Sequence, residues 1–378
     1  MNHTLLKLAT LLVLITAFSV HCAAAPPKPS IKPNSLWVTA YYAVWVQQAG
    51  TLTPAQIDYS AFSHLIHFAV VPAPDGSIDT SKDNITPADS AAVIAPAHKA
   101  GRKVLLSVGG WLTAAAFRSA YSDAHRTAFI ANLVQMVQSR GYDGLDIDME
   151  PLEASDAPGY AAFIRQLRAQ MTAASPHLLL TAATAAQPEL FARLSSSFNQ
   201  INLMTYDLAG PWTGFKTWHN SALYGGQTPM NPGQPFPSAS GMVERFIAAG
   251  VPRRKLGIGA AFYGTVWTGA DAPGLPISGV TMQTGVTYAA IMNTYYQPGR
   301  VRWDSAAQAP YLSIDGPVKR FVSYDNEMLC RKKVAYARAQ GLGGVMVWEL
   351  GSGYCPARPA GQREPLLSAI KRAWLASK

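Results

Sequence analysis

The chain has 378 residues, of which 49% are hydrophobic and 14% charged, a globular composition that can bury a large core and excludes a disordered or low-complexity polymer. The formal net charge is +9, but the basic residues are scattered. Their densest runs, Arg253-Arg254-Lys255 and Arg331-Lys332-Lys333, are expected to be solvated loop and helix faces, so we expect no nucleic-acid partner. The length is compatible with one barrel domain or with two smaller domains.

The N-terminal segment has the pattern of a secretory signal peptide. A lysine precedes an apolar run over residues 8–20, and Ala23-Ala24-Ala25 offers small residues for cleavage. A transmembrane anchor is the alternative, although this run ends early for a membrane span and no later run is long enough for one. We expect residues 1–25 to be removed on export, residues 26–34 to form a proline-rich extended linker, and residues 35–378 to fold as a monomer that is secreted, or periplasmic in a bacterium.

Strand and helix patterns alternate in the first part of the chain. Runs of β-branched and aromatic residues predict strands over residues 36–44, 64–71 and 103–107. Apolar residues at helical spacing then predict a helix over 123–140, with Gly141 placed to cap it. This helix leads to the most unusual stretch of the sequence.

Residues 144–150 are expected to form a strand with one apolar and one acidic face. Alternation divides its side chains between these two faces, which consist of Leu145, Ile147 and Met149 and of Asp146, Asp148 and Glu150. Acids beside apolar neighbours cost stability through desolvation and mutual repulsion, so we expect one face to pack and the other to perform chemistry. Asp143 has the opposite parity and is expected in the turn before the strand.

The second part of the chain continues the alternation. Helices are expected over residues 160–171, 242–249 and 365–375, and strands over 178–184, 201–206, 256–263 and 344–348. Eight strands separated by helices predict an α/β fold, a closed (β/α)8 TIM barrel rather than a doubly wound sheet. Residues 265–324, after the seventh strand, are too many for a loop and are expected to form a small insertion. Its pieces are a helix at 288–295 and strands at 301–303 and 319–323.

Carboxylates and aromatic residues gather at the carboxyl ends of the predicted strands, where the sites of such barrels lie. These strand-end residues are Tyr41, Tyr42, Trp45, Trp111, Glu150, Met204, Tyr206, Asp207, Phe262, Tyr263, Trp348 and Glu349. Flat aromatic faces suit sugar rings, and carboxylates suit acid catalysis of glycosidic cleavage. Any one of the aromatic residues is equally compatible with core packing, so their coincidence is what favours a site.

Four motifs resemble those of glycoside hydrolase family 18, the chitinases. Asp143-x-x-Asp146-x-Asp148-x-Glu150 is similar to the family signature DGxDxDxE, and Ser107-x-Gly109-Gly110 is similar to its second motif. Met204-Thr205-Tyr206-Asp207 and the late Trp348 also match the family pattern. The resemblance runs from residue 36 to the C-terminus, and the insertion resembles the α+β insertion of deep-cleft chitinases. It implies an endo-acting chitinase that binds chitin or N-acetylglucosamine oligosaccharides and needs neither metal nor cofactor.

The resemblance also implies a role for each site residue. Glu150 would protonate the leaving glycosidic oxygen, while Asp148 would stabilise positive charge on the N-acetyl group of the substrate and share a proton with Asp146. Tyr206 would hydrogen-bond the acetamido carbonyl, whose oxygen would attack the anomeric carbon in a retaining, substrate-assisted reaction. Trp348 would form the floor beneath the distorted sugar. The other substrate contacts would come from Tyr41, Phe68, Gly110, Trp111, Met204, Asp207 and Tyr263.

Two positions depart from the family pattern. Met149 replaces the tryptophan common between the last two acids, but its side chain is expected on the packing face, where catalysis would not need it. Thr265 stands where many relatives carry arginine, which calls the substrate contact of that arginine into question.

Three other functions are compatible with parts of the pattern. An endo-β-N-acetylglucosaminidase acting on N-glycans is the nearest, although relatives of that kind often lack the insertion. A chitin-binding lectin could share the fold, although such relatives have usually lost the acid that corresponds to Glu150. A metalloenzyme could use Asp146 and Asp148 as oxygen ligands, although no histidine cluster accompanies them.

The cysteines offer one further expectation. If cleavage removes Cys22, Cys330 and Cys355 remain, and an even number in an oxidising compartment favours a disulfide. Two unpaired cysteines are the alternative, because only geometry decides between the two. We expect a bond between Cys330 and Cys355.

Overall fold

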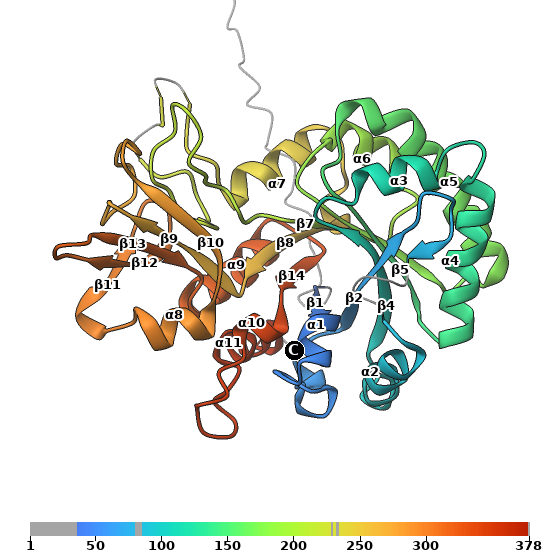
Figure 1. Cartoon of the computed structure of the whole chain (residues 1–378), viewed down its shortest axis with the longest axis horizontal. Coiled ribbons are helices and arrows are strands. Elements are labelled where there is room, and N and C mark those ends of the chain that lie inside the picture. The colour runs from blue at the N-terminus through green and yellow to red at the C-terminus, as the bar shows by residue number, and fades with distance from the viewer. Residues whose placement is uncertain (1–35, 80–84, 228–229, 232–233, 377–378) are drawn as a thin grey trace, which may run out of the picture. The chain divides into compact units, whose positions relative to one another are not determined.

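A closed barrel forms the centre of the computed structural model, which describes residues 36–79, 85–227, 230–231 and 234–376. Its strands are β1 (Trp37–Ala43), β2 (His64–Pro72), β4 (Lys103–Gly110), β5 (Gly144–Met149), β6 (Leu179–Thr184), β7 (Gln200–Leu203), β8 (Leu256–Ala261) and β14 (Gly344–Trp348). Within the described residues these strands pair in parallel in the order β1-β14-β8-β7-β6-β5-β4-β2, and β2 pairs back to β1 (Figure 1). The predicted (β/α)8 barrel is therefore confirmed, whereas the expected signal peptide and linker lie outside the described residues.

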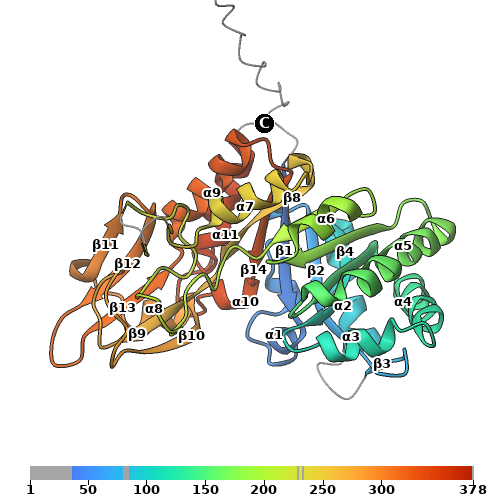
Figure 2. The same cartoon turned by 90° about the horizontal axis from the view of Figure 1, so that it is seen from above.

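Helices alternate with the strands and cover the outside of the barrel. They are α1 (Val44–Gln48), α2 (Pro87–Lys99), α3 (Ala114–Ala120), α4 (Arg126–Arg140), α5 (Ala157–Ala174), α6 (Pro188–Leu194), α7 (Ala239–Ala248), α9 (Glu327–Ala339), α10 (Leu350–Gly353) and α11 (Pro365–Leu375). Gly141 ends α4 with a left-handed φ of 79°, as its position predicts, and Figure 2 shows α4 beside α5. In the described part of the chain, none of the helices has both the length and the apolarity needed to cross a bilayer.

The insertion after β8 is a five-stranded antiparallel sheet with the strand order β10-β9-β13-β12-β11 (orange in Figure 1). Its strands are β9 (Tyr263–Thr268), β10 (Thr281–Thr287), β11 (Val301–Asp304), β12 (Ala309–Ile314) and β13 (Arg320–Tyr324), and helix α8 (Tyr288–Thr294) packs on β9 and β10. The α+β character of the insertion is as expected. Strands β9, β10 and β12 are not among the expected pieces. Strand β10 gives little sequence signal because it lies at the sheet edge with mostly exposed polar side chains and a bulge.

The two late cysteines are not bonded to each other, so the expected disulfide is wrong. Cys330 is buried in the first turn of α9, within the main apolar core. Cys355 follows α10, and its thiol lies 3.8 Å from the carbonyl oxygen of Gly353. Burial raises the pKa of both thiols, which therefore behave as small apolar side chains.

Candidate active site

The two faces of β5 separate as its alternation predicts. Leu145, Ile147 and Met149 belong to the apolar layer between the barrel and its helices, so Met149 does lie on the packing face. The acidic side chains take the other face, and Asp148 and Glu150 line a cleft of about 1100 Å³. Asp143 lies in the turn before the strand, where its carboxylate accepts hydrogen bonds from the Val104 amide and the Lys103 ammonium.

Asp146 lies beneath the cleft and is held by hydroxyl groups from three other strands. Tyr41 on β1 and Ser107 on β4 donate to its Oδ2 over 3.0 and 3.1 Å, and Thr181 on β6 donates to its Oδ1 over 2.6 Å. Ser107 and Thr181 are the register partners of Asp146 on the neighbouring strands. Burial raises the pKa of Asp146 to about 6, and the hydroxyl donors oppose that rise by stabilising the carboxylate.

Asp148 and Glu150 occupy environments that favour their protonated forms. Asp148 is buried, and its desolvation together with the charges of Glu150 and Asp146 raises its pKa well above the usual range. Burial and the nearby carboxylate of Asp207 raise the pKa of Glu150 to about 7. A carboxyl group that keeps its proton near neutral pH at the wall of a cleft can act as a general acid.

Asp207 connects the barrel to the insertion at this cleft. It follows β7 with a left-handed φ of 53°, and its carboxylate accepts a hydrogen bond of 2.7 Å from Tyr263 and one of 3.4 Å from Thr284 on β10. Its neighbour Tyr206 donates to the sulfur of Met346 over 3.7 Å. Because sulfur is a weak acceptor, the Tyr206 hydroxyl can exchange this contact for a stronger one with a ligand.

Aromatic side chains form the floor and rim of the cleft. The Trp348 ring packs against those of Phe68 and Tyr41, with ring centroids 4.7 and 5.5 Å apart. Trp111 is 71% exposed and Trp212 53% exposed, so both present ring faces to solvent while lining the cleft. Such faces offer stacking surfaces for the apolar sides of sugar rings.

The structure brings the expected site residues together. Those that line the cleft are Tyr41, Phe68, Gly110, Trp111, Asp148, Glu150, Met204, Tyr206, Asp207, Tyr263 and Trp348. Gly110 has a φ of +113°, and a Cβ there would meet the Phe68 ring at 2.8 Å, which explains the glycine. Of the other strand-end residues, Tyr42 and Phe262 pack into the core. Glu349 reaches the cleft wall, but its carboxylate accepts hydrogen bonds from the backbone amides of Gly351 and Ser352 at the start of α10.

Two residues of the site, Thr181 and Trp212, could not be identified from the sequence. Thr181 lies in a predicted strand, but its contact with Asp146 depends on strand register. Trp212 lies in an irregular segment without a periodic signal. Thr265, by contrast, is fully buried on β9 and does not line the cleft. Among the described residues, no group of three or more histidine, cysteine or acidic side chains could hold a metal ion, so the alternative of a metal at Asp146 and Asp148 gains no support.

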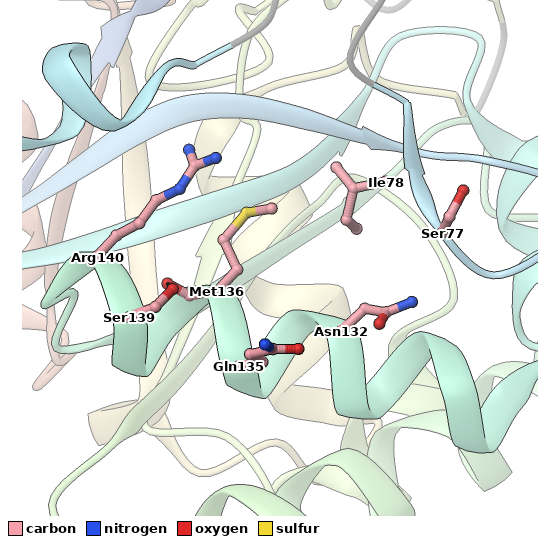
Figure 3. A pocket seen from close by; sticks show the side chains of 7 residues that line it. All are labelled: Ser77, Ile78, Asn132, Gln135, Met136, Ser139 and Arg140. Atoms are coloured by element: carbon pink, nitrogen blue, oxygen red, sulfur yellow. Dashed lines mark hydrogen bonds between the residues drawn. The ribbon is translucent and has the colours of Figure 1, made fainter.

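A second cavity of about 330 Å³ lies between the β2–β3 turn and α4, where β3 (Ile78–Asp79) is a short strand beside β2 (Figure 3). Its side chains are Ser77, Ile78, Asn132, Gln135, Met136, Ser139 and Arg140. Arg140 donates to the Ile85 carbonyl and Asn132 to the Gly76 carbonyl. These two polar side chains are therefore engaged in structural hydrogen bonds to neighbouring backbone segments. The cavity has no acidic or histidine side chain in its lining, and we assign the chemistry to the larger cleft.

Comparison with known proteins agrees with this geometry. Residues 38–353 match the family described as Glycosyl hydrolases family 18. Chitinase 1 of Aphanocladium album is 31% identical over 264 residues, which cover 65% of this chain and 61% of that protein. The match thus spans less than two thirds of the length of that relative.

Two solved structures share the fold. The Group IV chitinase of Ostrinia furnacalis, solved in complex with allosamidin, superposes with a TM-score of 0.79 at 24% identity, covering 91% of this chain and 100% of that chain. Human YKL-39, described as a pseudo-chitinase with retained chitooligosaccharide binding, has a TM-score of 0.78 at 23% identity and covers 89% of this chain and 99% of its own. At these identities the likeness concerns the fold.

Proposed function

The chain belongs to the glycosyl hydrolases of family 18, and we propose that it is a secreted, endo-acting chitinase that cleaves β-1,4-linked N-acetylglucosamine polymers. The observation that carries the proposal is the pairing of Glu150, whose pKa is raised to about 7, with the buried Asp148 in an aromatic cleft. The apolar run over residues 8–20 supports export. A cleft of about 1100 Å³ has room for several sugar units and supports binding within a polymer.

Glu150 is the general acid in this proposal. Its burial and the charge of Asp207 keep it protonated near neutral pH, so it can transfer its proton to the glycosidic oxygen as the bond to the anomeric carbon breaks. The Trp348 floor holds the sugar ring against the acid and limits access of water. Both effects favour departure of the leaving sugar.

The nucleophile in this proposal is the acetamido oxygen of the substrate. It attacks the anomeric carbon and forms a cyclic oxazolinium ion, which water opens with retention of configuration. Asp148 stabilises the positive charge on the acetamido nitrogen, and the raised pKa of this residue is consistent with a proton shared with Asp146. Tyr206 lines the same part of the cleft and orients the acetamido carbonyl.

Turnover of defined oligomers tests the proposal. The full chain is incubated with chitotetraose, colloidal chitin and fully deacetylated chitosan, and NMR of the fresh products identifies the first anomer. We expect cleavage of the two acetylated substrates with the β-anomer formed first, and no cleavage of the deacetylated polymer, which lacks the internal nucleophile.

Each contrary result identifies a different function or mechanism. Sugar binding without turnover would make the chain a chitin-binding lectin rather than an enzyme. Release of N-glycans from a glycoprotein with no action on chitotetraose would indicate an endo-β-N-acetylglucosaminidase. First appearance of the α-anomer would overturn substrate assistance while leaving glycoside hydrolysis intact.

A further inference from the structure

A buried ion pair lies behind the cleft, where the insertion returns to the barrel. Lys333 on α9 is fully buried and Asp325, just after β13, is 1% exposed, and their charged groups are 2.7 Å apart. Neither residue lines the cleft. A buried ion pair contributes little net stability, because desolvation of the two charges offsets their attraction. Its position, however, connects it to the segments that directly follow β7 and β8, where Tyr206 and Tyr263 lie.

One branch of this network reaches the end of β8. The Oδ2 atom of Asp325 accepts a hydrogen bond of 3.2 Å from the amide of Ala261, the last residue of β8. Tyr263 follows two residues later and donates to Asp207 in the cleft. The ion pair therefore fixes the backbone from which the Tyr263 side chain reaches the site.

The other branch reaches the end of β7. Lys333 donates to the hydroxyl of Ser221, which donates in turn to the carbonyl oxygen of Thr205 over 2.7 Å. The Thr205 hydroxyl also accepts a hydrogen bond from the amide of Gly259 on β8 and donates one to the carbonyl oxygen of the same residue, each over 3.0 Å. Thr205 directly precedes Tyr206, so its backbone sets the direction of the Tyr206 side chain.

We propose that Lys333 is a positioning residue that, through Ser221 and Asp325, holds the ends of β7 and β8 so that Tyr206 and Tyr263 meet the reacting sugar. The proposal rests on the function proposed above, because it assigns these tyrosines to the sugar that reacts. Lys333 acts only through other residues. Its effect should therefore concern the geometry of the transition state more than the binding of distant sugar units.

Ser221→Ala tests the proposal with the smallest change, because it removes the link to Thr205 and leaves the ion pair intact. We expect kcat on chitotetraose to fall at least about tenfold with KM nearly unchanged, since small misplacements of catalytic groups cost rate in this range. The affinity for a thiazoline analogue of the oxazolinium ion should fall by a similar factor. Ser221→Thr keeps a hydroxyl at this position and should restore both values.

Ser90→Ala is the matched control. Ser90 is equally buried, and its hydroxyl donates to the Thr86 carbonyl and accepts from Tyr142, but it lies on α2, outside the cleft lining. We expect the two alanine variants to lose similar thermal stability, while only Ser221→Ala loses catalytic rate.

Two outcomes would overturn the proposal. One is wild-type kcat in Ser221→Ala, and the other is a loss no larger than that of Ser90→Ala. If the unmodified protein shows no turnover, the proposed function fails, but thiazoline affinity still decides the positioning role, because binding needs no turnover. Equal affinity in the wild type and in Ser221→Ala would then refute it.

Discussion

Thr181 on β6 donates to Asp146 on β5 over 2.6 Å, the shortest of the hydrogen bonds that this carboxylate receives from hydroxyl groups. Asp148, two residues further along β5, has a buried Oδ1 with no hydrogen-bond partner among the described residues. Donors stabilise the ionised form of a carboxyl group, and burial without donors favours the protonated form. The pair is therefore arranged so that Asp146 carries the negative charge and Asp148 the proton before substrate binds.

Replacing Thr181 by valine should shift the acidic limb of the pH profile. The hydroxyl lowers the pKa of Asp146, so its removal raises that pKa above about 6. If the reaction needs one negative charge on the Asp146 and Asp148 pair, the acidic limb of kcat/KM moves to higher pH. The pH dependence of chitotetraose hydrolysis measures this shift.

Thr217→Val is the control for that change. Thr217 is also fully buried, but its hydroxyl donates to the carbonyl of Ala272, away from the acids. Both variants should lose about 1 to 2 kcal/mol of stability through an unpaired buried group, while only Thr181→Val moves the limb. If the acidic limb of the kcat/KM profile lay at the same pH in both variants, the assignment of the negative charge to Asp146 would be contradicted.

Glu150→Gln should remove most activity and preserve sugar binding, because the amide keeps the shape of the side chain but cannot donate the required proton. Turnover and binding of chitotetraose, measured separately, test this expectation. Near-normal turnover would mean that another group is the acid.

The same variant should change how stability depends on pH. The pKa of Glu150 is about 7 in the folded chain and 4.5 in its usual environment, so its contribution to stability is complete below pH 4.5 and is lost as pH rises through 7. Glutamine does not titrate. Relative to the wild type, Glu150→Gln should therefore gain roughly 2 kcal/mol between these pH values, after allowance for partial exposure. Denaturant unfolding at pH 4.5 and 7.5 measures the difference, which should be absent if the pKa of Glu150 is ordinary.

Asp207→Asn should move the basic limb of the pH profile to lower pH. The carboxylate of Asp207 disfavours ionisation of Glu150, so its replacement by a neutral amide lowers the pKa of Glu150 below about 7. The acid then loses its proton at lower pH. The profile of kcat/KM above pH 6 checks the direction, and a limb that stays in place would show that burial alone sets the pKa.

Trp111→Ala should weaken substrate binding without affecting the fold. The ring is 71% exposed, so its loss leaves no cavity, but a sugar stacked on it loses about 1 kcal/mol, or roughly a fivefold rise in KM. Tyr296→Ala, which removes an exposed ring outside the cleft lining, should leave KM unchanged. Equal effects of the two variants would argue against stacking on Trp111.

The sequence by itself determined the barrel strands and the acidic strand, because these signals are local. Alternation along residues 144–150 separates packing side chains from acids whatever the rest of the chain does. Reliance on local signals also explains why two of the helices were not predicted. Helix α2 contains Pro96, which argues against a helix, and α6 spans only Pro188–Leu194, too short for a clear periodic pattern.

Only the tertiary structure decided which residues hydrogen-bond to the acids and whether the two late cysteines are bonded to each other. Thr181 meets Asp146 through the register between β5 and β6, and Lys333 reaches Ser221 across 112 positions of the chain. Cys330 and Cys355 both belong to the main apolar core, yet they are not bonded, although their even number suggested a disulfide. Strand register and the contacts between distant segments are set by packing over long sequence separations, so the alternation within one strand does not specify them.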